Sequence, residues 1–252
     1  MDEGLKVQHE EFAAHADLEG RHWWFTGRRD ILRALLHAIA PRSTGVALLD
    51  IGCGTGGNAA ALAGEYDVMG IDPSADAIAF AQARFPLVRF KETGDPETGR
   101  AHLAAGGVVL LTDVLEHVDD DRALLARAIA VVPAGGHLLV TVPADPSLWS
   151  RHDTDFGHFR RYLADDFRAL WRDAAVEQRL LSYFNARLRP VIAAFRTIAP
   201  GAGNNLRVPA GPLNQLFRRT FAGEARALVA AIDCGTRPYR RGISLVAVLR
   251  KK

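Results

Sequence analysis

The sequence LLDIGCGTGGN at residues 48–58 decides the fold, because a glycine-rich turn joins an apolar segment to a helix-forming one. Residues 46–51 form a short, mostly apolar run of strand length, and residues 58–63 are good helix formers. The glycines between them let the backbone turn tightly and approach a ligand, because they carry no side chain that would clash. Backbone N–H groups at the start of the helix would face an electron-rich group. The stretch therefore predicts a nucleotide-cofactor loop after a buried strand.

The glycine spacing fits two kinds of cofactor. Gly52, Gly54 and Gly57 satisfy the GxGxxG pattern of dinucleotide-binding folds, whereas Gly52, Gly54 and Gly56 satisfy the GxGxG pattern associated with S-adenosylmethionine. Asp50 lies at the end of the predicted strand, where its carboxylate would repel a pyrophosphate but suit a cofactor that carries an ammonium and a sulfonium group. The spacing leaves both cofactors open, and Asp50 favours the second.

The length and composition predict one domain without a membrane span. A chain of 252 residues with 48% hydrophobic content can bury one sizeable core. No window approaches the roughly 20 consecutive apolar residues of a membrane span, and the acidic start lacks the features of a signal peptide. We therefore expect a cytoplasmic protein. Cys53 and Cys234 lie in different contexts and indicate neither a disulfide framework nor a metal cluster.

The charge is distributed unevenly along the chain. Residues 1–150 carry a net charge of −9, whereas residues 151–252 carry +11. A basic C-terminal part could attract an anionic substrate, a membrane surface or RNA. The alternative is a solvated arginine-rich surface without a partner, since only four of the 31 basic residues are lysine.

Strand and helix signals alternate from residue 46 onward, which predicts an α/β fold with a doubly wound, mostly parallel sheet. Ser74 is a candidate cap for the helix after the second strand, and three carboxylates at residues 119–121 suit the start of another helix. A further helix is expected over residues 165–174. The expected strands cover residues 46–51, 68–71, 88–91, 108–111, 137–142, 177–184 and 242–249.

The last two expected strands are separated by 57 residues, far more than a simple connection needs. Residues 189–198 and 213–232 have helix-compatible apolar spacing, separated by a stretch rich in glycine, asparagine and proline. We therefore expect a helical insertion or lid in a single domain. The predicted parts are an N-terminal helical cap (1–40), a cofactor-binding core (46–184), the insertion (185–241) and the last strand (242–250).

Five motifs follow one another in a characteristic order: DIGCGTG at 50–56, GIDPS at 70–74, TGD at 93–95, TDVLEHVDD at 112–120 and PAGGHLLVTVP at 133–143. In this order they resemble the class I S-adenosylmethionine-dependent methyltransferases, over residues 46–143, and in particular the small-molecule branch that includes the ubiquinone-biosynthesis O-methyltransferases. The resemblance implies a seven-stranded Rossmann-like sheet that binds S-adenosylmethionine. It also implies cofactor contacts from Asp50, Gly52, Gly54 and Gly56 to the methionyl part, Asp72 to the ribose and Asp95 to the adenine; Cys53, Pro73, Thr112 and Asp113 are expected to line the same site.

Two other segments, residues 21–29 and 152–162, resemble a narrower group of bacterial small-molecule methyltransferases and are expected to border the pocket. The resemblance makes Arg28 or Arg29 the candidate that meets the cofactor carboxylate. The aromatic residues beside them could instead anchor the N-terminal helix to the sheet. The candidate substrate contacts are Trp24, His152, Arg161 and Tyr162.

Methyl transfer is an in-line displacement, so positioning of the acceptor supplies much of the rate, and a hydroxyl acceptor usually needs a base as well. His158 is the first candidate for that base and His117 the second, although either histidine could simply hold its own loop.

Asp113, Glu116 and His117 form a D-x-x-E-H pattern that resembles the metal-binding E-x-x-E-H of ubiquinone-biosynthesis O-methyltransferases but departs from it at the first position. These three could hold Mg²⁺, yet related metal-independent enzymes share LEHV, so we expect no metal.

These observations favour methyl transfer from S-adenosylmethionine to a small molecule, with a hydroxyl oxygen as the first candidate acceptor and nitrogen or carbon still open. Arg160, Arg161 and the basic insertion suit an anionic acceptor. The rival enzyme is a dinucleotide-dependent oxidoreductase. The rival from another class is a cofactor-binding scaffold or regulator that uses its basic face to hold a partner. The sequence contains no obvious nucleic-acid-binding module, so no nucleic-acid partner is expected.

Overall fold

In the computed structural model, which describes residues 16–41, 45–103, 106–198 and 208–252, seven strands form one mixed sheet with the order β3-β2-β1-β4-β5-β7-β6. The strands are β1 (Ala47–Ile51), β2 (Asp67–Asp72), β3 (Arg89–Glu92), β4 (Val108–Thr112), β5 (His137–Pro143), β6 (Val176–Phe184) and β7 (Ser244–Lys251). Strands β1 to β5 pair in parallel, and β7 runs antiparallel to both β5 and β6. The predicted doubly wound, mostly parallel sheet is confirmed.

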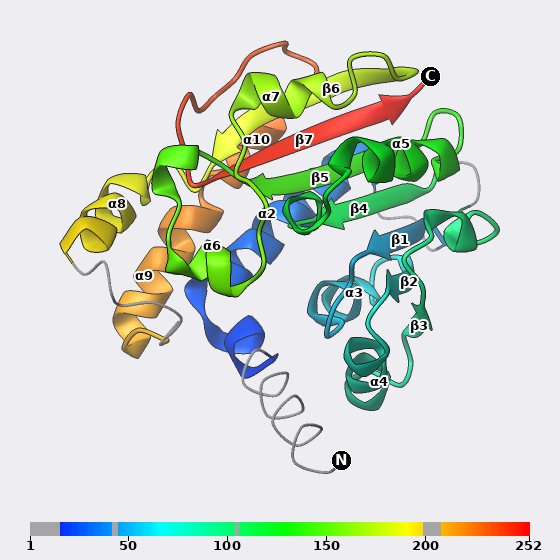
Figure 1. Cartoon of the computed structure of the whole chain (residues 1–252), viewed down its shortest axis with the longest axis horizontal. Coiled ribbons are helices and arrows are strands. Elements are labelled where there is room, and N and C mark those ends of the chain that lie inside the picture. Colours follow the sequence, from blue (N-terminus) through cyan, green and yellow to red (C-terminus); the bar gives the residue numbers. More distant parts are fainter. Residues whose placement is uncertain (1–15, 42–44, 104–105, 199–207) are drawn as a thin grey trace.

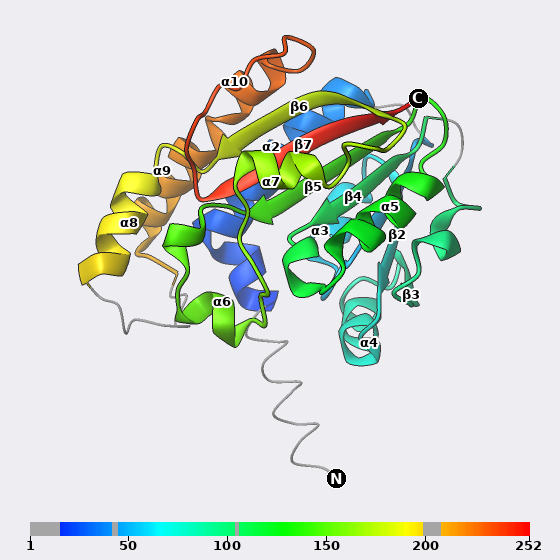
Figure 2. The same ribbon diagram turned by 45° about the horizontal axis from the view of Figure 1, so that its top comes forward.

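The two faces of the sheet are covered by different helices, which form two separate cores (Figures 1 and 2). Alternating side chains of β1 point to opposite faces, so that Leu48 and Leu49 belong to different cores. One face is covered by α5 (Asp121–Val131) and α7 (Ala164–Ala169). The other face is covered by α2 (Trp23–Ile39), α3 (Gly57–Leu62), α4 (Ala75–Arg84), α9 (Gly211–Ala222) and α10 (Ala225–Ala230).

The helix caps follow the local sequence. The side chain of Ser74 accepts a hydrogen bond from Ala77 N at 3.2 Å, which confirms the predicted cap of α4. Asp120 caps α5 by accepting from Ala123 N at 2.9 Å. Helix α7 ends at Ala169, so the prediction of a helix over residues 165–174 is wrong beyond this point; residues 170–173 form turns instead.

The insertion contains α8 (Arg189–Ile198), as predicted, and the helix-compatible residues 213–232 are helical over most of their length but form two helices. The structure divides them into α9 and α10 near Glu224, whose buried carboxylate accepts hydrogen bonds from the backbone N–H groups of Ala186 and Arg187. These bonds tie the junction of the two helices to the end of β6. Part of the expected connecting stretch, residues 199–207, lies outside the described residues.

The insertion packs closely on the N-terminal helix. Phe221 of α9 is fully buried and lies 5.9 Å from the Trp23 ring and 5.7 Å from the Phe184 ring. A Cβ on Gly27 of α2 would meet Phe221 Cδ1 at 2.9 Å, so this glycine allows the two helices to approach. Of the predicted N-terminal cap, residues 1–15 lie outside the described residues, and residues 16–21 are helical. Within the described part of the chain, none of the helices is both long and apolar enough to cross a membrane.

The carboxyl ends of β1, β2, β4 and β5 lie along one edge of the sheet. Figures 1 and 2 show α6 (Arg151–Asp155), α8 and α9 gathered near the end at which β5 and β6 finish. Ligands of open α/β sheets bind outside the carboxyl ends of the strands. This edge therefore contains the candidate site.

Candidate functional site

The glycine loop after β1 has an open side at Gly54. Gly52, Gly54 and Gly56 have φ values of 71°, 51° and 81°, in the left-handed region that favours glycine. A Cβ on Gly52 would overlap the Val114 side chain, and one on Gly56 would lie 2.8 Å from Phe90 Cζ. A Cβ on Gly54 would meet no atom within 4 Å. Gly52 and Gly56 are thus needed by the fold itself, whereas Gly54 faces space that a ligand can use.

Two acidic residues, Asp50 and Asp72, lie next to this loop. Asp72 accepts hydrogen bonds from Gly54 N at 3.0 Å and Ser74 N at 2.9 Å, which places its carboxylate directly beside the loop. Asp50 is 1% exposed, and neither carboxylate oxygen has a hydrogen-bond partner in the described part of the chain. Burial raises the pKa of Asp50 to about 7, although the nearby charge of Arg28 opposes the shift. The structure therefore places a buried, unsatisfied acid behind the glycine loop.

Arg28 reaches this site from α2. Its guanidinium forms an ion pair with Asp113 and lies 4.4 Å from the centre of the Trp24 ring. Burial lowers the pKa of Arg28 to about 10, so it remains a cation at neutral pH, and its Nε has no partner in the described part of the chain. Arg29 donates instead to the backbone oxygen of Glu19. Of the two predicted arginines, Arg28 is the one that meets the strand-end acids.

The sequence interpretation missed Glu19. Its carboxylate accepts a hydrogen bond from Thr55 Oγ1 at 2.6 Å and lies 3.7 Å from Arg84 Nη1. A Cβ on Gly57 would be 2.8 Å from Glu19 Oε2, so the acid sits against the start of α3. Glu19 precedes every motif, and no local pattern marks it; only the fold brings it to the glycine loop.

The other predicted cofactor residues occupy different environments. Thr112 is buried and accepts from Asn58 Nδ2 at 3.2 Å. Cys53 is buried beneath the loop, and burial raises the pKa of its thiol well above the usual range. Pro73 is exposed beside Asp72. Asp95 is exposed after β3, where it caps a short helical turn and pairs with Arg127 at 2.7 Å.

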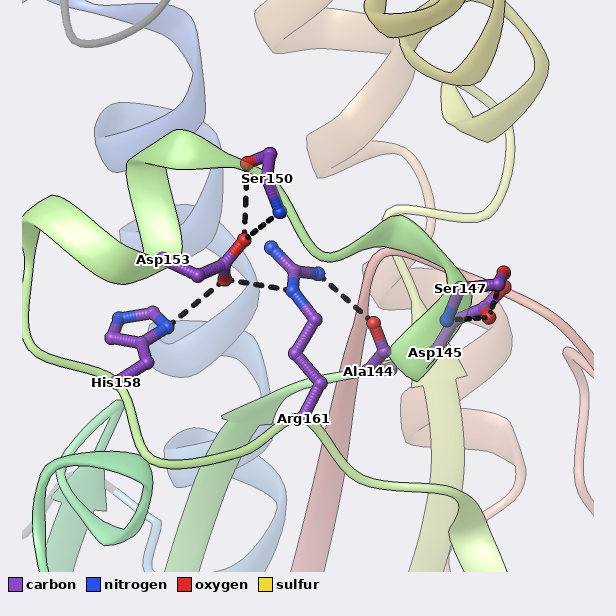
Figure 3. A network of polar contacts seen from close by, with 7 residues as sticks. All are labelled: Ala144, Asp145, Ser147, Ser150, Asp153, His158 and Arg161. Carbon is purple, nitrogen blue, oxygen red and sulfur yellow. Dashed lines mark hydrogen bonds and ion pairs between the residues drawn. The ribbon is translucent and has the colours of Figure 1, made fainter.

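A second polar network lies in the segment that follows β5 (Figure 3). Asp153 is completely buried and accepts hydrogen bonds from His158 Nδ1 at 3.0 Å and Arg161 Nε at 2.7 Å. Ser150 donates to the other carboxylate oxygen through its backbone N–H at 2.8 Å and its hydroxyl at 3.0 Å. Burial alone would raise the pKa of Asp153, but the hydrogen bond from His158 and the charge of Arg161 outweigh it and hold the pKa below its usual range.

Most of the predicted substrate contacts interact with other groups of the protein instead. Arg161 is 8% exposed, and its Nη1 donates to the backbone oxygen of Ala144 at 3.0 Å. Tyr162 is 3% exposed and donates to Asp121 Oδ2 at 2.7 Å. Trp24 is partly buried beneath Arg28. His152 lies in α6, and its side chain is outside the described part of the structure.

The two candidate bases lie together. The rings of His117 and His158 are 4.7 Å apart and perpendicular, and the potential metal-binding atoms of Glu116, His117 and His158 all lie within 4.8 Å of one another. Glu116 is 1% exposed, its Oε2 has no partner in the described part of the chain, and burial raises its pKa to about 8. Partial desolvation of the ring and the neighbouring His158 lower the pKa of His117. Asp113, the third member of the predicted metal pattern, pairs with Arg28 and accepts from Thr141 Oγ1 at 3.0 Å.

Comparison with known proteins agrees with this arrangement. A family model described as a methyltransferase domain matches residues 21–188. The chain belongs to this methyltransferase family. The methyl donor of its class is S-adenosylmethionine, which resolves the ambiguous glycine pattern in favour of GxGxG.

Curated relatives of the methyltransferase come from several branches. A probable S-adenosylmethionine-dependent methyltransferase of Mycobacterium tuberculosis is 28% identical over 182 residues, which cover 70% of this chain and 65% of the relative. A ubiquinone biosynthesis O-methyltransferase of Pectobacterium carotovorum is 28% identical over 156 residues, which cover 57% of this chain and 65% of the relative. The chain thus spans just under two thirds of the length of these relatives.

Solved structures share the fold. The putative methyltransferase from a complex with the Haloferax volcanii Trm112 activator aligns over 99% of this chain and 98% of its own, with a TM-score of 0.57 and 16% identity. A geranyl diphosphate methyltransferase aligns over 88% of this chain and 85% of its own, with a TM-score of 0.54 and 17% identity. At these identities the likeness supports the class I methyltransferase fold alone.

The residues around the glycine loop fit S-adenosylmethionine. The open face of Gly54 leaves room for a ligand against the backbone, and the two carboxylate oxygens of Asp50 lack a hydrogen-bond donor among the described residues. Buried acceptors without partners are costly, so a ligand that supplies such groups relieves this cost. Asp72, beside Gly54, offers carboxylate oxygens to ribose hydroxyls.

Proposed function

We propose that the protein transfers a methyl group from S-adenosylmethionine to a hydroxyl oxygen of a small acceptor. The observation that carries the cofactor half of this proposal is the unsatisfied carboxylate of Asp50, buried behind an open glycine loop in a chain of the methyltransferase family. When bound, the cofactor supplies an electrophilic methyl group on a sulfonium. The protein then has to hold the acceptor in line and take up its proton.

The proposed cofactor contacts follow from the positions of the side chains. Asp50 compensates the positive charge of the methionyl part, and Arg28 offers its guanidinium to the carboxylate. Asp72 binds the ribose hydroxyls beside Gly54. Asp95 reaches the adenine only if its carboxylate is shared with Arg127.

His158 is the proposed base on the acceptor side, and His117 is the second candidate. His158 is held by a buried carboxylate, whereas His117 bonds to the backbone of Phe156 and is exposed. An anionic acceptor would have to meet arginines other than Arg160 and Arg161, because Arg160 pairs with Asp121 at 2.9 Å and Arg161 with Asp153.

Calorimetry and then a turnover assay test the proposal in two steps. The purified protein should bind S-adenosylmethionine and its demethylated product more tightly than NADH. It should then release that product when it is given radiolabelled donor and a panel of phenols, alcohols, amines and carbon acids. Label found in an amine or at carbon would refute the hydroxyl assignment. Tight donor binding without turnover on any member of the panel or on cell extracts would favour a non-catalytic scaffold.

A divalent cation is an alternative to the histidine base on the acceptor side, favoured by the grouping of Glu116, His117 and His158. A cation bound to Nε2 of His158 would leave that nitrogen no lone pair for a proton. One carboxylate and two imidazoles form a donor set that suits Mn²⁺, Fe²⁺ or Zn²⁺ better than Mg²⁺. Titration with Co²⁺ should produce a visible absorption band that His158→Gln abolishes. The matched control is His37→Gln in α2, where the histidine pairs with Glu65, and this variant should keep the band. An identical response in the wild type, His158→Gln and His37→Gln would refute the metal site.

A further inference from the structure

The carboxylate of Asp153 has four donors in a fully buried position. His158 Nδ1 and Arg161 Nε donate to Oδ1, while the backbone and hydroxyl of Ser150 donate to Oδ2. An acid surrounded by donors is stabilised as the anion, and Arg161 supplies the positive charge that balances it in the interior. Asp153 is therefore ionised throughout the range in which enzymes work.

An ionised Asp153 determines which nitrogen of His158 carries the proton. A carboxylate can only accept hydrogen bonds, so the Nδ1 that lies 3.0 Å from it has to be the protonated nitrogen. In the neutral ring Nε2 then carries the lone pair. Figure 3 shows the second ring nitrogen of His158 on the edge that points away from Asp153.

Three other groups lie around the contact between His158 and Asp153. The ring of His117 is perpendicular to that of His158 at a distance of 4.7 Å, and the buried Glu116 lies beside both histidines. Arg161 is paired with the same carboxylate of Asp153.

The bond from His158 is not needed to close its own turn. His158 N donates to Asp153 O at 2.9 Å, and Gly157 N donates to Thr154 O at 3.0 Å, so backbone bonds already fix residues 153–158. Arg161 independently ties Asp153 to the end of β5 through Ala144 O. The contact between the side chains of His158 and Asp153 therefore fixes the orientation of the His158 ring, while the backbone bonds fix the turn.

We infer that Asp153 is the positioning residue of the reaction: it holds His158 with the proton on Nδ1, so that Nε2 can accept the proton of the acceptor hydroxyl. This inference rests on the proposed function. As the acceptor oxygen forms its bond to the methyl carbon, the carbon–sulfur bond breaks and its electrons stay on sulfur, while the hydroxyl proton moves to Nε2. The imidazolium keeps its hydrogen bond to Asp153 and later returns this proton to solvent.

The tautomer of His158 can be measured without any acceptor. Protein labelled with ¹⁵N-histidine is studied by long-range proton–nitrogen correlation at pH 8, and His158→Gln assigns the signal. The wild type should show the proton on Nδ1. Because Asp153→Ala leaves Arg161 buried without a partner and can fail to fold, the test variant is the double substitution Asp153→Ala with Arg161→Gln. In this variant the Nε2–H form should appear.

Ser150→Ala is the matched control, because it removes one donor from the same carboxylate and leaves His158 in place. It should keep the Nδ1–H form. With an accepted hydroxyl substrate, the double variant should lose about 100-fold in kcat with a much smaller change in KM, whereas Ser150→Ala should lose less than about 3-fold. A wild type with its proton on Nε2, or a double variant with an unchanged tautomer, overturns the role of Asp153 even if methyl transfer occurs. If the tautomer is as expected but the protein methylates no hydroxyl, the proposed function is overturned, and the proton transfer with it.

Discussion

Substitution of Asp50 by asparagine should stabilise the cofactor-free protein at neutral and alkaline pH while weakening its cofactor binding. Asp50 is buried and has no hydrogen-bond partner in the described part of the chain, and its pKa is raised from 3.8 to about 7, mainly by burial. Its ionised form is therefore destabilised in the folded state. Asparagine has nearly the same shape and does not ionise, so it removes this cost.

The sign and size follow from proton linkage. Between about pH 4 and pH 7 the unfolded chain has lost the Asp50 proton while the folded chain retains it, so the free energy of unfolding falls as the pH rises. About three pKa units correspond to at most ~4 kcal/mol. The advantage of Asp50→Asn over the wild type should be small at pH 4 and should reach its full value above pH 7. Each kcal/mol corresponds to about 2–4 °C in the melting temperature of a protein of this size.

Thermal unfolding of both proteins at pH 4.5, 6 and 8 without cofactor measures the effect. Asp95→Asn is the matched control, because that acid is exposed and its pKa is lowered by a hydrogen bond from Arg127. It should give no gain in stability at pH 8. A constant difference between Asp50→Asn and the wild type across all three pH values would refute the reasoning.

Calorimetry on the same proteins tests what Asp50 faces. The wild type should bind S-adenosylmethionine more tightly as the pH rises through about 7, and Asp50→Asn should lose this dependence. The demethylated product retains the ammonium group but lacks the sulfonium. An equal loss of affinity for both ligands assigns Asp50 to the ammonium, and a loss confined to the donor assigns it to the sulfonium.

Four further substitutions separate ligand contacts from structural ones. Gly54 is an open position with φ of 51°, so Gly54→Ala should abolish cofactor binding, measured by calorimetry, and lower stability by about 1–2 kcal/mol. Gly52→Ala should lower stability further, measured by thermal melting, because its Cβ overlaps Val114. Phe221→Ala should lower stability by about 3–5 kcal/mol in denaturant unfolding, because the ring is fully buried between the insertion and the rest of the protein; a loss below about 1 kcal/mol would indicate a mobile lid. Tyr162→Phe should cost about 1 kcal/mol in stability through one buried hydrogen bond and leave the acceptor KM unchanged, and a raised KM would restore its role as a substrate contact.

The parallel half of the fold could be predicted because its signals are local. Apolar runs, glycine turns and caps such as Ser74 act within a few residues, and the observed bounds of β1 to β5 differ from the expected ones by one or two residues. The division between α9 and α10 could not be predicted in this way. It depends on Glu224 reaching the backbone of Ala186 and Arg187, which are far away in the sequence.

The cofactor side was more predictable than the acceptor side for a similar reason. Asp50 and Asp72 lie at the ends of β1 and β2, which pair in parallel, and Gly54 follows β1 closely, so strand order alone brings them together. On the acceptor side, the direction of each side chain depends on its partners. Arg161 was expected to meet a substrate, but the buried carboxylate of Asp153 holds it inward.

The backbone at the carboxyl edge gives a physical reason for this difference. Three non-glycine residues just beyond β4, β5 and β6 have left-handed φ: Asp113 at 55°, Asp145 at 61° and Asn185 at 52°. Such conformations cost about 1–3 kcal/mol and persist where surrounding contacts impose them, most often at functional sites. Asp113 is held by Arg28 and Asp145 by Arg189, each an arginine distant in sequence. Asp and Asn adopt this region more readily than other non-glycine residues, so the backbone itself agrees with local propensity. The two ion pairs join segments far apart in the sequence, and such contacts cannot be predicted from local propensity.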